Sequence, residues 1–438
     1  MNRKLTCILA SVFLLSAESA FAGGLALPTR GVRALSLAGA FVAGAEEANA
    51  LWYNPSRLDQ TSVAFELGAV ETSATFTPPD GTSVSNSATP LLNPTLGAIF
   101  RVNDTLSLAL GAYAPYSGQL AFPEDGPQRY SLTANDHTTL LVLNVAAAVR
   151  LGRLSLGAGI QNVMAHVKQR SVLSSYTGLF GTPDDPTLDT LSNLDLNDPF
   201  TLSANAGASF EAGPFTFGLA LQLPYTVSGD AKFQVRLGES VFLDPVVVEG
   251  DSARFELPFP LMVRAGVLWR ATPDLKVELA ANFENWSVQE ELVVDPTGRI
   301  RLRNVPGIGD YQLGPLVIPR QMQDTWSFHL GSDFAVWEGL HLRGGGFYET
   351  AGFADATTNV SQLDGTKLGL ALGASYQLGN FRFDLAASRI FQFTRDVTNS
   401  DVRQLNPTNP EQALVVGNGR YEAGYWVGGI GVAWLLDV

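Results

Sequence analysis

Apolar and polar residues alternate along several stretches of this chain. In Leu275–Glu284 the odd positions are all apolar, and the even positions hold the lysine, both glutamates and the asparagine. The stretch Phe215–Leu223 repeats the pattern, with aromatic and branched residues at the odd positions. A period of two puts one set of side chains on each face of a β-strand. Because Lys or Arg facing the bilayer midplane costs about 2–4 kcal/mol, a spanning strand of this kind must turn its charged face toward the lumen.

The alternation predicts fourteen strands joined by alternately short and long connections. We expect the strands near residues 61–76, 93–102, 105–116, 138–151, 153–167, 200–211, 214–229, 254–270, 274–289, 323–336, 338–349, 364–377, 380–393 and 421–436. The long connections are rich in Pro, Asp and Ser and cover 77–92, 117–137, 168–199, 230–253, 290–322, 350–363 and 394–420. This regularity is typical of an outer-membrane barrel, and an even strand number puts both termini in the periplasm. A secreted β-sandwich or propeller is the alternative, but such folds rarely alternate short and long loops so regularly.

The composition and the N-terminal residues indicate the cellular compartment of the protein. Hydrophobic residues make up 46% of the chain and charged residues 16%, yet no apolar run after residue 22 is long enough for a spanning helix. Residues 1–22 have the basic start, apolar stretch and Ala20-Phe21-Ala22 end of a signal peptide. The single cysteine, Cys7, lies inside it, which excludes disulfides and Cys-based sites from the mature chain. A net charge of -14 makes nucleic acid a poor partner.

Residues 23–60 precede the first strand of a barrel that we place at 61–438. They are rich in Gly and Ala, with apolar residues at a spacing that suits a short helix, and are too few to fold alone. A fourteen-stranded barrel is wider than one filled by its own side chains. We therefore expect residues 23–60 to plug the lumen rather than to form a disordered periplasmic tail, because they are apolar and poor in charge.

The stretch "GVRALSLAGAFVAGAEEANALWYNPSRL" resembles the N-terminal hatch of the FadL family of outer-membrane long-chain fatty-acid and hydrocarbon transporters. That hatch has a Gly/Ala-rich stretch, an acidic pair and an Asn-Pro-Ala segment, for which this chain has Glu46-Glu47 and Asn54-Pro55-Ser56. Further segments follow in family order, among them "GPQRYSL", "LGAGIQNVMAHVK", "LPFPLMVRAGVLWRATPDLKVELAANFENWS", "DTWSFHLGSDFAVWEGLHLRGGGFYET" and "GTKLGLALGASYQLGNFRFDLAAS". The resemblance covers almost all of the mature chain.

The resemblance implies a monomeric fourteen-stranded transmembrane barrel with an N-terminal hatch inside it. It implies passive uptake of hydrophobic compounds, most simply long-chain fatty acids, by capture at the outer loops, passage to an apolar pocket, hatch movement and lateral release. The hatch gate would comprise Glu46, Glu47, Asn54, Pro55 and Ser56. The pocket would be lined by Gly23, Leu25, Leu27 and Pro28, at the start of the hatch. A kink at Tyr113, Pro115 and Tyr116 would open the wall sideways, although a proline there equally suits an ordinary strand end.

Loop residues supply the remaining candidates. The aromatic and apolar residues that could form a capture groove are Phe122, Tyr130, Tyr176, Leu179 and Phe180. Packing within their own loops is the alternative for each. A carboxylate ligand needs a cationic partner, and Arg254 and Arg320, at the outer ends of two strands, are candidates.

The chain shows no motif for catalysis, a metal or a cofactor. Its four histidines are scattered and no G-x-S-x-G elbow is present, so we expect a transporter rather than an enzyme. Expected partners are hydrophobic small molecules and outer-membrane lipid. A general porin for small polar solutes and a loop-mediated adhesin or receptor stay open as alternatives, and the sequence leaves the choice of hydrophobic substrate open.

Overall fold

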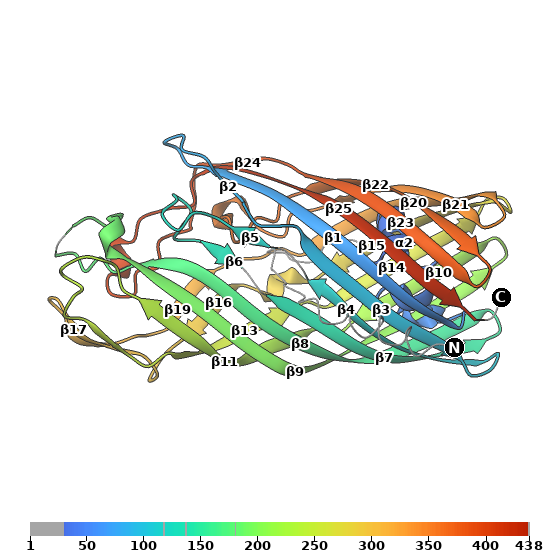
Figure 1. Ribbon diagram of the computed structural model, residues 1–438, viewed down its shortest axis with the longest axis horizontal. Coiled ribbons are helices and arrows are strands. Elements are labelled where there is room, and N and C mark those ends of the chain that lie inside the picture. Colours follow the sequence, from blue (N-terminus) through green and yellow to red (C-terminus); the bar gives the residue numbers. More distant parts are fainter. Residues whose placement is uncertain (1–29, 117–118, 136–137, 180, 437–438) are drawn as a thin grey trace, which may run out of the picture.

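The computed structural model describes residues 30–116, 119–135, 138–179 and 181–436 of the chain. Fourteen long strands form one closed antiparallel barrel, because each pairs with the next and β25 pairs with β1 (Figure 1). They are β1 (Ser62–Thr77), β3 (Leu91–Arg101), β4 (Leu106–Tyr116), β7 (Thr139–Leu151), β8 (Leu154–Ser174), β9 (Asp189–Ala212), β10 (Phe215–Gln222), β14 (Met262–Arg270), β15 (Leu275–Glu284), β20 (Thr325–Trp337), β21 (Leu340–Glu349), β22 (Lys367–Leu378), β23 (Phe381–Gln392) and β25 (Gly419–Leu435). The predicted fourteen-stranded barrel is confirmed.

The two faces of the wall follow the alternation. On β10 the exposed exterior residues are Phe215, Phe217, Leu219 and Leu221, while the residues between them are buried in the interior. Aromatic side chains pair on the exterior near the short turns, where Phe381 stacks on Trp434 with ring centroids 6.2 Å apart. Apolar residues therefore face the membrane and polar ones the lumen, as a barrel in lipid requires.

Several strands continue beyond the fourteen-stranded belt as an extended wall. The segments that pair above the belt are β11 (Tyr225–Arg236), β13 (Ser252–Phe259), β16 (Glu291–Asp295) and β19 (Leu316–Pro319). The prediction of a connection over 168–199 is wrong in part, since β8 runs to Ser174 and β9 begins at Asp189. The exterior of β8 and β9 is polar over these residues, because a wall that rises above the lipid faces water. A stretch rich in Asp and Ser thus forms part of a strand rather than a loop.

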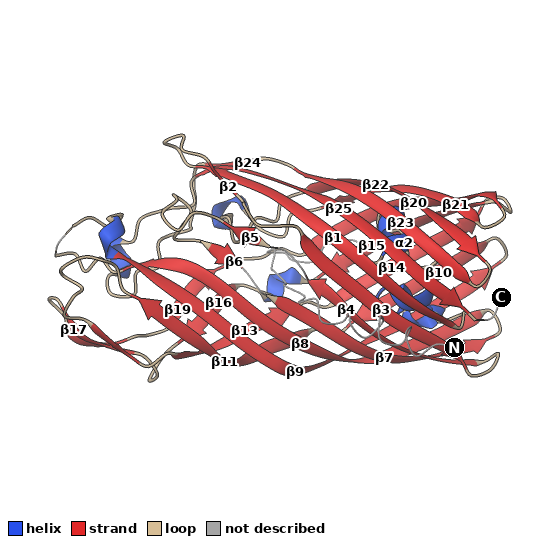
Figure 2. Cartoon of the chain, viewed as in Figure 1, coloured by secondary structure: helices blue, strands red, loops and turns tan. Residues whose placement is uncertain are grey.

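The long connections gather at the end of the barrel opposite the short turns (Figure 2). Their short elements are β2 (Val84–Ser85), β5 (Leu120–Ala121), β6 (Ala134–Asn135), β12 (Val247–Glu249), β17 (Arg301–Val305), β18 (Gly309–Gln312), β24 (Arg395–Val397) and the 3₁₀ turns η4 (Pro186–Leu188), η5 (Trp286–Val288), η6 (Asp355–Thr357) and η7 (Pro410–Gln412). β12, β17 and β18 form a separate small sheet. No helix in the described ranges is long and apolar enough to cross a membrane.

Residues 30–58, the inner segment, lie within the barrel near the short-turn end (Figure 1). The segment comprises α2 (Val32–Ser36), η2 (Glu47–Asn49), α3 (Ala50–Tyr53) and η3 (Pro55–Arg57). Nearly all of its residues are buried, and its elements contact strands around the wall from β1 to β25. None of its helices exceeds five residues, so its conformation depends on the wall.

Candidate functional site

The wall facing the inner segment is lined by glycine. A Cβ at Gly157 would overlap the carbonyl of Pro55, and one at Gly345 would lie 2.6 Å from the carbonyl oxygen of Leu37. The glycines whose added Cβ would meet the inner segment are Gly97, Gly111, Gly157, Gly207, Gly218, Gly266, Gly331, Gly345, Gly373 and Gly429. Since each sits on a different strand, the segment packs closely against the wall on almost every side, through backbone atoms at some glycines and through side chains at others. The abundance of glycine in the chain thus has a packing reason.

Two wall carboxylates hold the backbone of the inner segment. Glu278 of β15 accepts three consecutive amide hydrogen bonds, from Val42 (2.6 Å), Ala43 (2.8 Å) and Gly44 (2.9 Å). Glu66 of β1 accepts from the backbone N–H of Val32, 3.1 Å away, at the start of α2, and from an asparagine of η2. A carboxylate that accepts several N–H groups forms the stronger, charge-assisted kind of hydrogen bond. These contacts fix where the segment sits.

Asn54 is the most fully bonded residue of the predicted hatch gate. Its Nδ2 donates to the carbonyl of Val42 at 3.0 Å and to that of Ala208 on β9 at 3.3 Å. Its Oδ1 accepts from both the backbone N–H and the hydroxyl of Ser56, at 3.1 and 2.7 Å. Asn54 is completely buried and extended (φ -164°), and Pro55 begins η3 after it. The structure therefore brings the Asn-Pro-Ser residues together at the wall.

The acidic pair of the predicted gate lies in an ion-pair network. Arg33 of α2 bridges Glu46 and Glu47, with its Nη1 3.0 Å from a carboxylate oxygen of Glu47. Glu47 also pairs with Arg382 of β23, which in turn contacts Asp384 at 2.8 Å. Glu47 is 2% exposed, whereas the side chain of Glu46 is 37% exposed. The buried glutamate joins the segment to the wall, and the other faces a polar cavity of about 150 Å³.

An aromatic cluster lies above the inner segment. Tyr116, at the end of β4, packs against Phe259 and Trp286 with ring centroids 4.7 and 6.2 Å apart, and Tyr225 stacks on Phe259 at 4.8 Å. Below the cluster, the guanidinium of Arg264 lies 4.4 Å from the ring centroid of Trp52. The region is aromatic, with the cation of Arg264 at its floor and the carboxylate of Glu284 accepting from the indole N–H of Trp286 at 2.7 Å.

The β3–β4 ladder ends beside this cluster. β3 and β4 pair only as far as Thr95 and Tyr113, although β3 continues along β1 to Leu91. Beyond Tyr113, the register between β4 and β7 shifts before Tyr116 pairs again. Pro115 lies in the shifted part and has no N–H to donate. The predicted kink residues therefore lie where the β3–β4 ladder ends, and there Nδ2 of Asn93 donates to the carbonyl of Ala114 at 3.1 Å.

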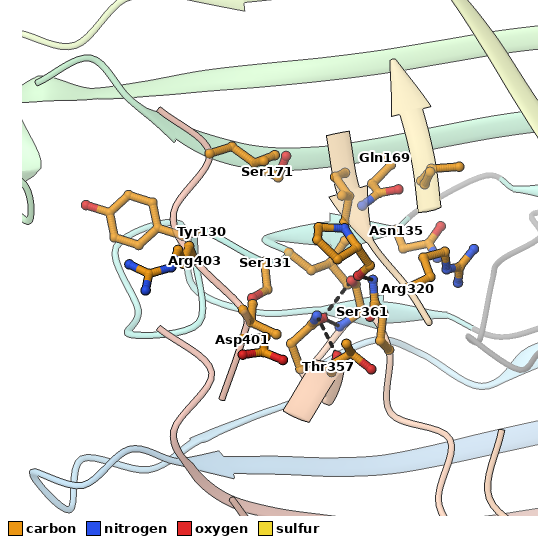
Figure 3. Close-up of a pocket in the computed structure, with 18 of the residues that line it drawn as sticks. Tyr130, Ser131, Asn135, Gln169, Ser171, Arg320, Thr357, Ser361, Asp401 and Arg403 are labelled. Atoms are coloured by element: carbon orange, nitrogen blue, oxygen red, sulfur yellow. Dashed lines mark hydrogen bonds between the residues drawn. The ribbon is translucent and has the colours of Figure 1, made fainter. Parts of the chain in front are cut away.

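A second cavity lies higher, under the outer loops. It has a volume of about 90 Å³ and lies among β8, β13, β16, β19 and three loops (Figure 3). Its lining is mixed. The apolar part comprises Leu132, Val167, Phe255, Leu257, Leu292, Ile318, Pro319, Val402 and Leu405, and the polar part includes Tyr130, Asn135, Gln169, Gln362, Asp401 and Arg403. We call it the outer pocket.

Arg320 lines the outer pocket and is 7% exposed. Its guanidinium makes no hydrogen bond or ion pair with any residue in the described ranges, and it lies over the ring of Phe353, 5.3 Å from the centroid. Burial lowers the pKa of Arg320 to about 10, so it stays charged at neutral pH. A buried cation without a counter-ion is costly unless a ligand supplies one. Arg320 can therefore accept an anionic group inside a pocket that has both apolar and polar walls.

The other loop candidates are dispersed. Tyr130 lines the outer pocket and donates to Asp189 at 2.8 Å, and Phe122 is buried in a separate apolar cluster. Tyr176 is half-buried, whereas Leu179 is exposed and lies against Gly307. Arg254 faces outward on β13 and pairs with Glu256 at 3.3 Å. The predicted pocket residues Gly23, Leu25, Leu27 and Pro28, and Phe180, lie outside the described residues.

Sequence reasoning did not single out the wall residues that hold the inner segment. The missed residues are Glu66, Glu278, Arg264, Arg382, Asp384 and the lining glycines. A signal existed for the charged ones, since the alternation predicts that charges turn inward. Nothing in a strand pattern shows which inward residue meets which part of the segment.

Comparison with known proteins supplies the family. A family described as "Outer membrane protein transport protein (OMPP1/FadL/TodX)" matches residues 13–429. The chain belongs to this family. Membership confirms the predicted resemblance and agrees with a transport protein rather than an enzyme.

Relatives of the family agree in fold. A FadL homologue from Pseudomonas aeruginosa superposes with a TM-score of 0.75 at 17% identity, covering 94% of this chain and 99% of its own. The toluene transporter TodX of P. putida gives 0.68 at 14% identity, with 94% and 100% covered, and TbuX of Ralstonia pickettii, also a toluene transporter, gives 0.64 at 16%, with 94% and 99% covered. NMB0088 of Neisseria meningitidis serogroup B, named as an outer membrane protein, is 26% identical over 143 residues, so the match spans 30% of each chain.

Proposed function

We propose that this protein is a passive outer-membrane uptake channel for hydrophobic compounds that carry a carboxylate, with long-chain fatty acids as the substrate class. Both termini would be periplasmic and the channel monomeric. The observation that carries the substrate class is Arg320, a buried cation that has no counter-ion among the described residues and lies in a pocket of mixed apolar and polar lining. A neutral aromatic such as toluene, the substrate named for TodX and TbuX, would leave this charge unpaired.

The proposed path begins at the outer pocket. A carboxylate would accept hydrogen bonds from the Arg320 guanidinium, while the acyl chain lies along the branched side chains of β13, β16 and β19. Removal of the chain from water contributes about 0.8 kcal/mol per buried methylene. Capture thus combines one polar contact with extended apolar burial, as ligand pockets usually do.

The aromatic cluster around Tyr116 would receive the ligand next. It lies between the outer pocket and the inner segment, and the β3–β4 separation lies beside it. We propose that the ligand leaves sideways through this separation. An axial route would have to displace the inner segment from Glu278, Glu66 and the lining glycines.

The inner segment would serve as the hatch, with residues 23–60 as its proposed extent. Asn54, Pro55, Ser56, Glu46 and Glu47 would set how firmly it closes the lumen against small solutes. Support comes from the complete burial of Asn54 and the ion pairs of Glu47. Replacing Asn54 by Ala should lower lipophile uptake while the barrel still assembles.

Uptake by cells that produce the protein tests the proposal. We expect labelled oleate to enter faster than in cells without it, and Arg320→Met to slow oleate entry by about tenfold, the loss of roughly 1.4 kcal/mol of binding. Toluene entry should change little in the same variant. Arg254→Met is the matched control, because Arg254 faces outward and already has a carboxylate partner.

Two outcomes would overturn the proposal. Equal loss of oleate and toluene entry in Arg320→Met would show a structural role for the arginine and remove the argument for a carboxylate. Entry of small sugars without any entry of oleate or toluene would instead favour a general porin.

A further inference from the structure

One basic residue breaks the apolar exterior of the barrel. On β23 the exposed exterior residues Phe381, Phe383 and Leu385 are followed, at the same alternation, by Arg389 and then Phe391. The other exterior neighbours of Arg389 across the sheet are Leu370 on β22 and Trp426 on β25. An arginine among such residues faces the membrane rather than the lumen.

The guanidinium of Arg389 is oriented but unpaired. It lies 5.0 Å from the ring centroid of Trp426 and 5.2 Å from that of Phe391. Gly424 leaves room for it, since a Cβ there would lie 3.1 Å from one Nη. Across the described ranges, Arg389 has no hydrogen bond or ion pair. The aromatic rings hold the group in place without satisfying its N–H donors.

The depth of Arg389 matches a lipid headgroup. It lies eight positions after Phe381, whose ring stacks on Trp434 at the short-turn end, which is about 27 Å along a strand at about 3.4 Å per residue. With a tilt of about 40°, this corresponds to roughly 20 Å across an apolar band about 25 Å tall. Arg389 therefore lies near the outer edge of the band, where aromatic residues are enriched.

An exposed carboxylate lies in the same row. Glu71 of β1 is directly opposite Trp426, which is directly opposite Arg389. Glu71 is exposed and faces outward like Arg389. Two strand spacings separate the two residues, or roughly 10 Å between their backbones. A cation and an anion thus flank one tryptophan at the lipid boundary.

We propose that Arg389, Trp426 and Glu71 form an exterior binding site for a membrane lipid whose headgroup carries a phosphate and an ammonium group. Arg389 binds the phosphate, for which the planar guanidinium offers paired donors. Glu71 accepts from the ammonium group, and Trp426 packs along the glycerol and upper acyl chain. The site is separate from the lumen and does not depend on the proposed substrate.

Native mass spectrometry of the full-length protein tests this site. The protein would be purified in a phosphate-free maltoside detergent and titrated with dioleoyl phosphatidylethanolamine, dioleoyl phosphatidic acid or dioleoylglycerol. We expect phosphatidylethanolamine to bind about tenfold more tightly to wild type than to Arg389→Gln, as for loss of one charge-assisted contact of about 1.4 kcal/mol. Glu71→Gln should weaken phosphatidylethanolamine but not phosphatidic acid. Arg254→Gln is the control, because that arginine is exterior but already paired.

The outcomes separate the possibilities. Equal binding of phosphatidylethanolamine by wild type and Arg389→Gln would overturn the proposal, as would equal affinity of wild type for dioleoylglycerol and the two phospholipids. Displacement of the bound lipid by millimolar inorganic phosphate would also overturn it, since the site would then take a free ion. Heat-modified mobility on gels checks barrel assembly in each variant. If Arg389→Gln fails to assemble, Arg389→Lys, which keeps the charge but not the paired donors, should show a smaller loss.

Discussion

The barrel has two interior levels that differ in how they are filled. Near the short turns, glycines let the backbone of residues 30–58 approach the wall, and Glu278, Glu66 and Asn54 bond it there. Toward the loops, large apolar side chains and polar ones surround a cavity, and Arg320 has no counter-ion among the described residues. The closed level packs residues 30–58 directly against the wall, and a few buried polar atoms there, among them Nε and Nη2 of Arg30, have no hydrogen-bond partner in the described residues. The outer level keeps an unfilled cavity, and the guanidinium of Arg320 there has no polar partner in the described residues.

The largest effect should come from Glu278→Ala. This change leaves three buried amides of the inner segment without an acceptor, at about 1–3 kcal/mol each. We expect a loss of more than about 3 kcal/mol in the free energy of unfolding, measured by urea titration in detergent micelles, together with faster entry of small antibiotics into cells. Glu256→Ala, on the exterior of β13, is the control. An unchanged unfolding curve would mean that the segment does not depend on this carboxylate.

Gly157→Ala should have the next largest effect. The new methyl group would overlap the carbonyl of Pro55, and overpacking of this kind costs about 1–3 kcal/mol. Urea titration again provides the measurement. Gly68→Ala is the matched change, since its Cβ would meet only ordinary contacts, the nearest at 3.4 Å. If both variants lose the same stability, close approach is not the reason for glycine at this level.

Pro115→Ala tests the side opening between the two levels. Alanine restores an N–H to β4 where its pairing with β7 shifts, and so favours a continuous ladder. We expect little change in stability and oleate uptake reduced by less than about tenfold, or 1.4 kcal/mol in the barrier. Pro199→Ala, near the bulge between β8 and β9, controls for proline removal at another irregular position. Normal uptake in Pro115→Ala would favour the ordinary strand end.

Ile318→Ala should have a small effect on stability. Ile318 is half-buried at the outer pocket, so loss of its methyl groups should cost about 1 kcal/mol or less. Oleate uptake should nevertheless fall, because the acyl chain loses part of its contact. Val317→Ala, the exposed neighbour, should change neither quantity. A loss of several kcal/mol would show that the outer level is packed as tightly as the inner one.

Much of the wall could be predicted from the alternation alone. The exterior of β10 and the inward position of Glu278 on β15 agree with the predicted faces. The height of the wall could not be predicted, because Asp189 and the residues after it have a loop-like composition yet pair with β8 above the membrane. Strand pairing there depends on a neighbour distant in sequence, which local composition does not report.

Part of the candidate site could also be predicted from the sequence. Asn54 and Glu47 were marked by the resemblance, but only the structure shows that Asn54 bonds to β9 and that Glu47 meets Arg382, 335 positions away. Arg254 and Arg320 are equivalent as loop-flanking arginines. Their difference arises from the fold, which gives one a carboxylate partner and buries the other in the lining of a cavity.

The sequence by itself determined the barrel, its lipid-facing surface and the inward direction of its charges, because a period of two in a membrane allows only one arrangement of faces. The tertiary structure decided which residues meet: which glycines face residues 30–58, which carboxylates hold them, and which arginines stay unpaired. Those contacts join residues that are far apart in the chain. Closure of the barrel, rather than any local pattern, brings them within hydrogen-bonding distance.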